Sequence, residues 1–238
     1  MDTRAFVMFG LPHCAALAAT AVASVFMVRL NRSARVRPEV KQRANVILAI
    51  ILITAVSLDP VLTWLRYRAI PEVALRQVRE TALPFYLCDV VSLVLAYALI
   101  RRRQRWAEIG YLWGMAGTLQ GLITPTLYFS WDTVEYYAFF AQHGGVPVAA
   151  LTLAFGTKLA PQYGAFWRAV FWSWIYMIVV YGLNVLLGAN YGFLNGKPGV
   201  HTLFDYMGPY PWYLLTLQAF AFALYLLFLL PFWRRREG

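Results

Sequence analysis

Two residues of this 238-residue chain place a nucleophile and a base inside long apolar stretches. Cys88 lies in Leu83–Asp89 and His143 lies in Gln142–Gly145, and both segments are short polar breaks. A thiol is a weak nucleophile until it loses its proton, and an imidazole can take that proton. The pair therefore allows nucleophilic catalysis. A buried cysteine is also often a small hydrophobe and a buried histidine a hydrogen-bonded packing residue, so both interpretations stay open.

The elements that carry these residues are predicted to be membrane helices. The chain is 61% hydrophobic and 13% charged, whereas soluble domains carry about 25% charged residues. Its apolar residues fall in runs of about 20, which excludes an outer-membrane barrel. We expect an all-α polytopic membrane protein, with one transmembrane domain over residues 1–238 and a bundle of seven transmembrane helices. The expected spans are Phe6–Val28, Ala44–Leu65, Leu83–Ile100, Trp106–Leu127, Val134–Phe155, Phe166–Leu187 and Trp212–Phe232.

The basic residues predict an orientation. Fifteen of the 21 lysine and arginine residues fall on one side of the expected membrane. Because basic residues concentrate in cytoplasmic loops, we expect the N-terminus outside and the C-terminus in the cytoplasm. Residence in a bacterial cytoplasmic (inner) membrane is a separate expectation. This distribution accounts for the net charge of +10, and no nucleic-acid partner is predicted. The six basic residues of the outer side are Arg4, Arg66, Arg68, Arg76, Arg79 and Lys197.

Several polar residues are expected in the outer half of the membrane beside Cys88 and His143. Asp89 follows Cys88 directly, and Asp59 lies near the outer end of the second span. Gln120 and Thr124 are four residues apart, which places both on one helix face. Gly144 and Gly145 allow a close approach by a neighbouring helix or lipid chain. One lateral cavity open to the outer leaflet would explain this placement.

Two segments expected on the outer side differ from the spans in composition. Arg66–Ala82 carries charged residues at helical spacing, which predicts a short interfacial helix. Ala189–Tyr213 is dense in Gly and Pro, which disfavours regular helix, and its aromatic residues suit the headgroup level. By composition alone this segment is an interfacial loop.

Other chemistries fit less well. His13 and Cys14 are a possible metal-ligand pair, but adjacent helical residues point apart, and no metal or cofactor is predicted. A disulfide between Cys14 and Cys88 within lipid is also not expected. The last span lacks the lysine that a retinal protein needs for its Schiff base.

The motifs around these residues resemble a known family. Leu83–Asp89, Gly110–Gln120, His143–Gly145 and Asn190–Tyr213 are similar to the YwaF-like bacterial membrane proteins, relatives of the eukaryotic transmembrane protein 164 acyltransferases. The resemblance runs from about Ala44 to Leu215. It implies a seven-helix fold and, from the eukaryotic branch, transfer of a fatty acyl group between phospholipids without coenzyme A.

The same resemblance implies roles for individual residues. Cys88 matches the acyl acceptor and His143 its partner. Bacterial relatives often carry His two residues before the cysteine, where this chain has Tyr86. The possible oxyanion donors are Gln120, Thr124 and Asn190. The headgroup is expected to contact Lys197 together with Tyr191, Asp205 and Trp212 of the aromatic loop. Three further residues, Asp59, Tyr86 and Asp89, are expected to support the site.

The expected function is a membrane-embedded phospholipid acyltransferase acting through a Cys-His dyad, with phospholipid and lysophospholipid as partners. One alternative is a lipid hydrolase with the same dyad, in which water replaces the lysolipid acceptor. The other is a non-enzymatic seven-helix transporter or receptor, for which the polar cluster is a ligand site. The sequence makes no prediction of oligomeric state.

Overall fold

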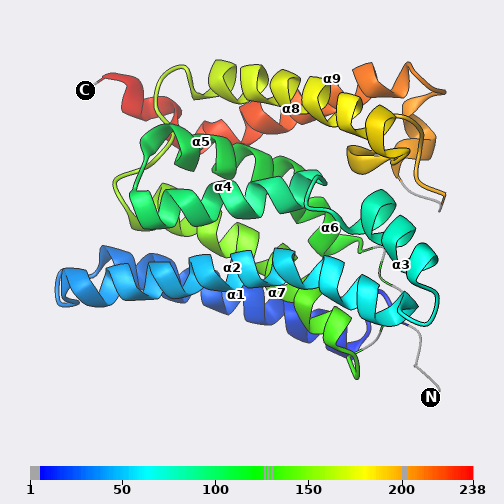
Figure 1. Cartoon of the computed structure of the whole chain (residues 1–238). Coiled ribbons are helices and arrows are strands. Elements are labelled where there is room, and N and C mark those ends of the chain that lie inside the picture. The colour runs from blue at the N-terminus through cyan, green and yellow to red at the C-terminus, as the bar shows by residue number, and fades with distance from the viewer. Residues whose placement is uncertain (1–5, 126, 128, 130, 200–202, 238) are drawn as a thin grey trace.

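Within the residues that the structure describes, every regular element is helical (Figure 1). The structure is a computed structural model that describes residues 6–125, 127, 129, 131–199 and 203–237, the last four by backbone alone. The long helices are α1 (Leu11–Arg32), α2 (Pro38–Tyr67), α4 (Leu87–Arg101), α5 (Gln104–Trp113), α7 (Val134–Leu151), α8 (Ala165–Leu187) and α9 (Tyr213–Leu229). The short ones are α3 (Pro71–Gln77), α6 (Leu119–Ile123), the π-helices η1 (Val78–Ala82), η2 (Gly114–Thr118) and η3 (Thr152–Gly156), and the 3₁₀ turns η4 (Tyr191–Phe193), η5 (Leu203–Met207) and η6 (Leu230–Glu237).

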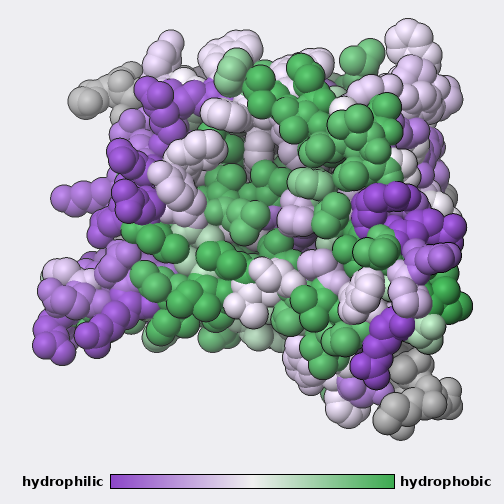
Figure 2. Space-filling model, in the orientation of Figure 1, coloured by the Kyte–Doolittle hydropathy of each residue, from purple (hydrophilic) through white to green (hydrophobic). Residues whose placement is uncertain are grey.

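The molecule is an integral membrane protein. Among the described residues, five helical segments are long and apolar enough to cross a bilayer: Leu11–Arg32, Pro38–Tyr67, Val134–Gly156, Ala165–Leu187 and Tyr213–Trp233. A sixth arises if Pro71–Ala82 and Leu87–Arg101, which meet at a 68° bend, count as one span. Figure 2 shows a broad apolar band between two hydrophilic ends. This is the surface that a bilayer requires.

The long helices run side by side in three groups (Figure 1). α1 and α2 pack with α7, the pair α4 and α5 lies in the middle, and α8 with α9 forms the opposite edge. Leu52, Val91, Leu112 and Val146 are fully buried where these groups meet. The middle helices therefore touch protein on most sides, while α8 and α9 leave large apolar side chains such as Leu186 and Ile178 on the surface.

All seven expected apolar segments contain helix, but several boundaries differ. The first was expected to begin at Phe6 and α1 begins at Leu11, and the second was expected to begin at Ala44 and α2 begins at Pro38. Two further differences fall at breaks. The third segment was expected to begin at Leu83, but α4 begins at Leu87, because Pro84 holds Leu83 extended (φ −71°, ψ 150°). The fourth was expected to reach Leu127, but the helix ends at Ile123. Thr124, which precedes Pro125, leaves the helical region (φ −126°, ψ 68°).

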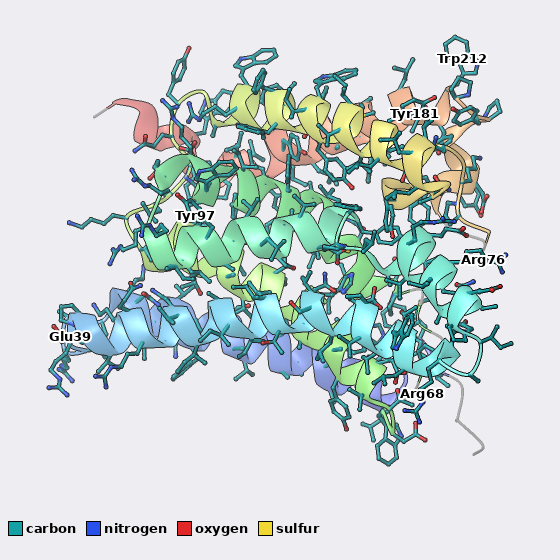
Figure 3. The ribbon with its side chains drawn as sticks, in the orientation of Figure 1. Glu39, Arg68, Arg76, Tyr97, Tyr181 and Trp212 are labelled. Carbon is teal, nitrogen blue, oxygen red and sulfur yellow. The ribbon has the colours of Figure 1, made fainter. Side chains whose placement is uncertain are left out.

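The two segments that were expected on the outer side have the predicted local structure. Arg66–Ala82 contains the short helices α3 and η1, and the described part of Ala189–Tyr213 contains only 3₁₀ turns before α9 begins. Figure 3 places Arg68, Arg76 and Trp212 at one end of the bundle and Glu39 at the other.

A buried ion pair lies at the end of the bundle that holds Glu39. Glu108 of α5 is fully buried, and Arg168 of α8 contacts its carboxylate at 2.7–2.8 Å. Gln104 and the backbone N–H of Gln162 donate to the other oxygen at 2.9 and 3.0 Å. A buried carboxylate with this many donors is well satisfied, so the group ties α5 to α8.

Candidate functional site

Cys88 lies in the first turn of α4, directly after the bend. The carboxylate of Asp89 accepts a 3.1 Å hydrogen bond from the backbone N–H of Tyr86, which satisfies one of the free donors at the start of the helix. Cys88 is half-buried, and its Sγ lies 3.9 Å from Oδ1 of Asp89. The Pro84 break thus ends one helix and presents Cys88 at the start of the next.

Asp89 joins α4 to α7. Its Oδ1 accepts a 2.6 Å hydrogen bond from Nε2 of Gln142, and both side chains are buried. A short bond to a buried carboxylate is one of the stronger contacts that a side chain can make. Asp89 therefore accepts hydrogen bonds from Tyr86 and Gln142, and its partner on α7 is Gln142 and not His143. Asp59, exposed on α2, is close enough for its charge to act on Cys88 and Asp89.

His143 is held by its own helix. Nδ1 lies 3.1 Å from the carbonyl oxygen of Phe139, and the ring stacks on Phe139 with centroids 3.9 Å apart. Because a carbonyl only accepts, Nδ1 carries the proton and Nε2 is left as the basic nitrogen. Within the described chain, Nε2 has no hydrogen-bond partner, and it faces Gly121 of α6, where an added Cβ would lie 3.2 Å from it.

The residue before Cys88 and the ring of His143 pack on the same segment from two sides. An added Cβ at Gly117 would lie 2.9 Å from Leu87, the neighbour of Cys88, and one at Gly121 would lie 2.9 Å from the His143 ring. Among the described residues, neither side chain hydrogen-bonds to the other, since each bonds elsewhere. The dyad stays a prediction, and η2–α6 packs on His143 and on the neighbour of Cys88.

The two polar residues expected on the fourth span lie at its end. The Thr124 hydroxyl donates to the carbonyl of Gln120 at 3.0 Å, and Thr124 is exposed. The Gln120 side chain is half-buried. The two share one face as their spacing predicted, but the Thr124 hydroxyl is committed to its own helix.

The aromatic loop reaches the bend through Tyr191. Tyr191 is fully buried, its hydroxyl donates to the carbonyl of Arg79 at 2.9 Å and accepts from the backbone N–H of Leu83 at 2.9 Å. Burial raises the pKa of this phenol, so the hydroxyl keeps the proton that it donates. Its ring packs edge-to-face on Tyr86, with centroids 5.0 Å apart. Tyr191, expected to bind substrate, holds the break before Cys88 in place.

The other expected loop residues divide between packing and surface. The Asn190 side chain bonds within its own loop. Its amide nitrogen donates to the carbonyl of Gly196 at 2.9 Å, and its oxygen accepts from the backbone N–H of Asn195 at 3.0 Å. Lys197 lies 5.8 Å over the ring of Tyr213, a cation–π distance. Asp205 and Trp212 are exposed, and Figure 3 shows Trp212 at the far edge of the bundle. The structure brings Tyr86, Cys88 and Asp89 together but does not bring Trp212 to them.

His13 and Cys14 belong to a different contact. Nδ1 of His13 accepts from the backbone N–H of Phe9 at 2.9 Å, and Nε2 donates to the carbonyl of Leu122 at 3.0 Å. Both ring nitrogens are therefore engaged, and His13 ties α1 to the end of α6. Cys14 and Cys88 are both free thiols.

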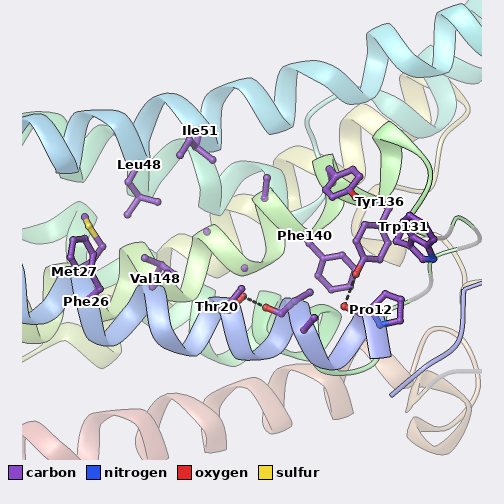
Figure 4. Close-up of a pocket in the computed structure, with 18 of the residues that line it drawn as sticks. Pro12, Thr20, Phe26, Met27, Leu48, Ile51, Trp131, Tyr136, Phe140 and Val148 are labelled. Atoms are coloured by element: carbon purple, nitrogen blue, oxygen red, sulfur yellow. Dashed lines mark hydrogen bonds between the residues drawn. The ribbon is translucent and has the colours of Figure 1, made fainter. Parts of the chain in front are cut away.

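A separate apolar groove of about 1190 Å³ lies between α1, α2 and α7 (Figure 4). Its lining includes Ala19, Ile51 and Phe140, and Gly144 and Gly145 form its floor. Cys88 and His143 do not line it. The groove is thus not the lateral cavity expected around the two, which stays a prediction.

At the glycine pair, two neighbouring helices approach α7 through their side chains. An added Cβ at Gly144 would lie 2.6 Å from Oγ1 of Thr20 on α1, and one at Gly145 would lie 2.9 Å from Leu52 on α2. Figure 4 shows α1 and α2 on this face of α7.

Comparison with known protein families decides the family. The model of the TMEM164 family matches residues 8–229, nearly the whole chain. The chain belongs to the TMEM164 family. No curated protein and no solved structure matches it. In this TMEM164-family chain, sequence reasoning missed Gln142 as the partner of Asp89. Polar residues next to both chemical candidates were the available signal, since Gln142 precedes His143 as Asp89 follows Cys88.

Proposed function

We propose that this protein is a membrane-embedded phospholipid acyltransferase that works without coenzyme A through Cys88 and His143. One observation carries the proposal. Leu87, the residue before Cys88 on α4, and the His143 imidazole on α7 pack on consecutive turns of η2–α6, and the Asp89–Gln142 hydrogen bond joins the direct neighbours of Cys88 and His143. Family membership agrees with it, given the acyltransferase activity that the resemblance implies.

The proposed reaction has two steps, which are acylation of Cys88 and transfer of the acyl group to a lysolipid. His143 takes the thiol proton of Cys88, and the thiolate adds to the ester carbonyl of a phospholipid. The tetrahedral intermediate expels the lysolipid alkoxide, which receives the proton from His143, and an acyl thioester remains on Cys88. A second lysolipid then gives its hydroxyl proton to His143 and attacks the thioester, which releases a remodelled phospholipid and restores the thiol.

The proposal includes a topology of seven transmembrane helices with the N-terminus outside and the C-terminus in a bacterial cytoplasm. All seven apolar segments are helical, and α1 begins at the end of the bundle opposite to the one where the last helix ends, which supports an odd number of crossings (Figure 1). The turns between α1 and α2 and between α4 and α5 are rich in arginine. Both lie at the end of the bundle where the last helix ends (Figure 1). This agrees with a cytoplasmic face there.

The test is transacylation in vesicles. The purified protein is given a phospholipid with a labelled acyl chain and an unlabelled lysophospholipid, without coenzyme A. We expect labelled product from wild type, none above background from Cys88→Ala, and a 10²–10⁴-fold loss for His143→Gln, the usual range for a general base. Cys14→Ala is the matched control and keeps full activity, because that thiol lies outside the site.

The alternatives give different results in the same assay. A lipid hydrolase releases free fatty acid and leaves the lysolipid unacylated. A transporter or receptor gives no acyl product from wild type, and Cys88→Ala retains its function. Transacylation by Cys88→Ala at the wild-type rate would contradict the proposal.

A further inference from the structure

Among the residues that the structure describes, one buried hydroxyl has no hydrogen-bond partner. Oγ1 of Thr118, in the π-helix η2, is buried without a hydrogen bond, and the residue is 4% exposed. Other buried helical hydroxyls in the chain donate to the carbonyl four residues back, as Thr152 does to Val148 at 2.6 Å and Ser173 to Ala169 at 2.8 Å. A buried polar group without a partner costs free energy, so its presence needs a reason.

Thr118 lies between the two chemical candidates. Gly114, Thr118 and Gly121 are spaced four and three residues apart, so they form one stripe along η2–α6. An added Cβ at Gly114 would meet Val146 of α7 at 2.8 Å, and one at Gly121 would meet His143 at 2.9 Å. The stripe therefore faces α7, and Thr118 lies at the level between Val146 and His143.

The same stretch of chain packs on the first turns of α4 through Leu87 and Val91. An added Cβ at Gly117, the residue before Thr118, would lie 2.9 Å from Leu87, and one at Gly114 would lie 3.6 Å from Val91. Thr118 is thus level with the first turn of α4, which holds Cys88. Nε2 of His143 also has no hydrogen-bond partner among the described residues and faces Gly121, one turn from Thr118. Thr118 Oγ1 and His143 Nε2 thus lie one turn apart, both without a partner among the described residues, and π-helical turns of this kind are frequent at functional sites.

We propose that the Thr118 hydroxyl donates a hydrogen bond to the carbonyl oxygen of the acyl group being transferred. This inference rests on the proposed acyltransferase function. When the Cys88 thiolate adds to the ester carbon, the electron pair of the carbonyl bond moves to the oxygen, and Thr118 stabilises that charge without giving up its proton. The same bond forms again when the lysolipid hydroxyl attacks the thioester. Of the donors expected from sequence, Thr124 and Asn190 are already bonded to their own segments.

The experiment compares Thr118→Val, Thr118→Ser and Thr152→Val in the vesicle transacylation assay, with thermal unfolding in detergent as a second readout. Valine keeps the shape of threonine and removes only the hydroxyl. We expect Thr118→Val to lower kcat by 10²–10³-fold, the loss found when one oxyanion donor is removed, with KM changed less than threefold. Thr118→Ser keeps kcat within tenfold of wild type.

Stability separates this role from a structural one. A hydroxyl with no partner stabilises nothing, so Thr118→Val is expected to unfold at the wild-type temperature or above it. Thr152→Val, which removes a bonded hydroxyl, is expected to unfold lower and to keep its kcat. A kcat for Thr118→Val within threefold of wild type, while Cys88→Ala is inactive, overturns this inference and leaves the proposed function standing. A fall in unfolding temperature for Thr118→Val as large as for Thr152→Val overturns it too. Full activity of Cys88→Ala overturns the proposed function instead.

Discussion

At the scale of single residues, the site depends on how Asp89 is satisfied. A carboxylate within a membrane-spanning region is costly, and here it accepts hydrogen bonds from the backbone of Tyr86 and from Gln142. These bonds position the turn that carries Cys88 against the turn that carries His143. Gln142 is therefore a positioning residue for both.

Replacing Gln142 by leucine tests this role. Gln142→Leu leaves a buried carboxylate short of one donor, which is expected to lower the free energy of unfolding by about 1.5–3 kcal/mol, the value of a hydrogen bond to a charged group. Transacylation is expected to fall as well, because α4 and α7 lose their link. The readouts are unfolding in detergent and the vesicle assay.

Gln42→Leu is the matched control, since the one bond of Gln42, to the carbonyl of Ile100, is 3.4 Å long and exposed. It is expected to change stability and activity little. An unfolding free energy for Gln142→Leu equal to that of wild type would contradict the role assigned to Gln142.

At the scale of elements, α7 is the helix around which the bundle is organised. Four successive residues face four different neighbours: Gln142 contacts α4, His143 packs on α6, Gly144 on α1 and Gly145 on α2. Successive helical residues turn by about 100°, so a fully surrounded helix presents one residue to each side. The polar pair faces the candidate site and the glycine pair faces the apolar groove.

The close packing at Gly121 leads to a second prediction. In Gly121→Ala the new methyl group would lie 2.9 Å from the His143 ring, which the Phe139 stack and the Nδ1 hydrogen bond hold in place. We expect a loss of about 1–3 kcal/mol in unfolding free energy, as for overpacked cores. We expect transacylation to fall about 10²-fold from displacement of the base.

Gly182→Ala in α8 is the comparison, because nothing lies within 4 Å of its added Cβ. There alanine is expected to stabilise by about 0.4–1 kcal/mol. If Gly121→Ala and Gly182→Ala have the same unfolding free energy and the same transacylation rate, the His143 ring adjusts freely and the prediction for Gly121 is wrong.

At the scale of the whole molecule, an apolar band separates two hydrophilic ends (Figure 2). The turn between α1 and α2 lies at one end, and the loop between α8 and α9 lies at the other (Figure 1). The proposed orientation puts the first turn in the cytoplasm and the loop outside.

Cysteine labelling in intact cells measures this orientation directly. In a Cys14→Ala background, Gly199→Cys is expected to react with a membrane-impermeant maleimide added outside. Arg35→Cys is expected to react only after the membrane is permeabilised. Both positions are exposed in the structure. The background variant alone controls for the half-buried thiol of Cys88, and the reverse pattern would invert the topology.

Much of the fold was predictable from sequence, for a physical reason. Backbone groups in hydrocarbon must bond within their own segment, so each long apolar run had to become a helix. The short helix in Arg66–Ala82 and the helix-poor loop after Ala189 followed from local spacing and from Gly and Pro. The breaks at Pro84 and Pro125 shifted two boundaries by about four residues, because proline restricts the residue before it.

The sequence by itself thus determined the helices, the family resemblance and the two residues that could do chemistry. Tertiary structure decided the rest: that Asp89 bonds to Gln142, that Tyr191 is buried under the bend, and that η2–α6 packs on both Leu87 and His143. Helical periodicity tells which residues share a face but not which helix will cover it. The unpartnered hydroxyl of Thr118 belongs to this second class, because a missing bond is visible only when every neighbour is in place.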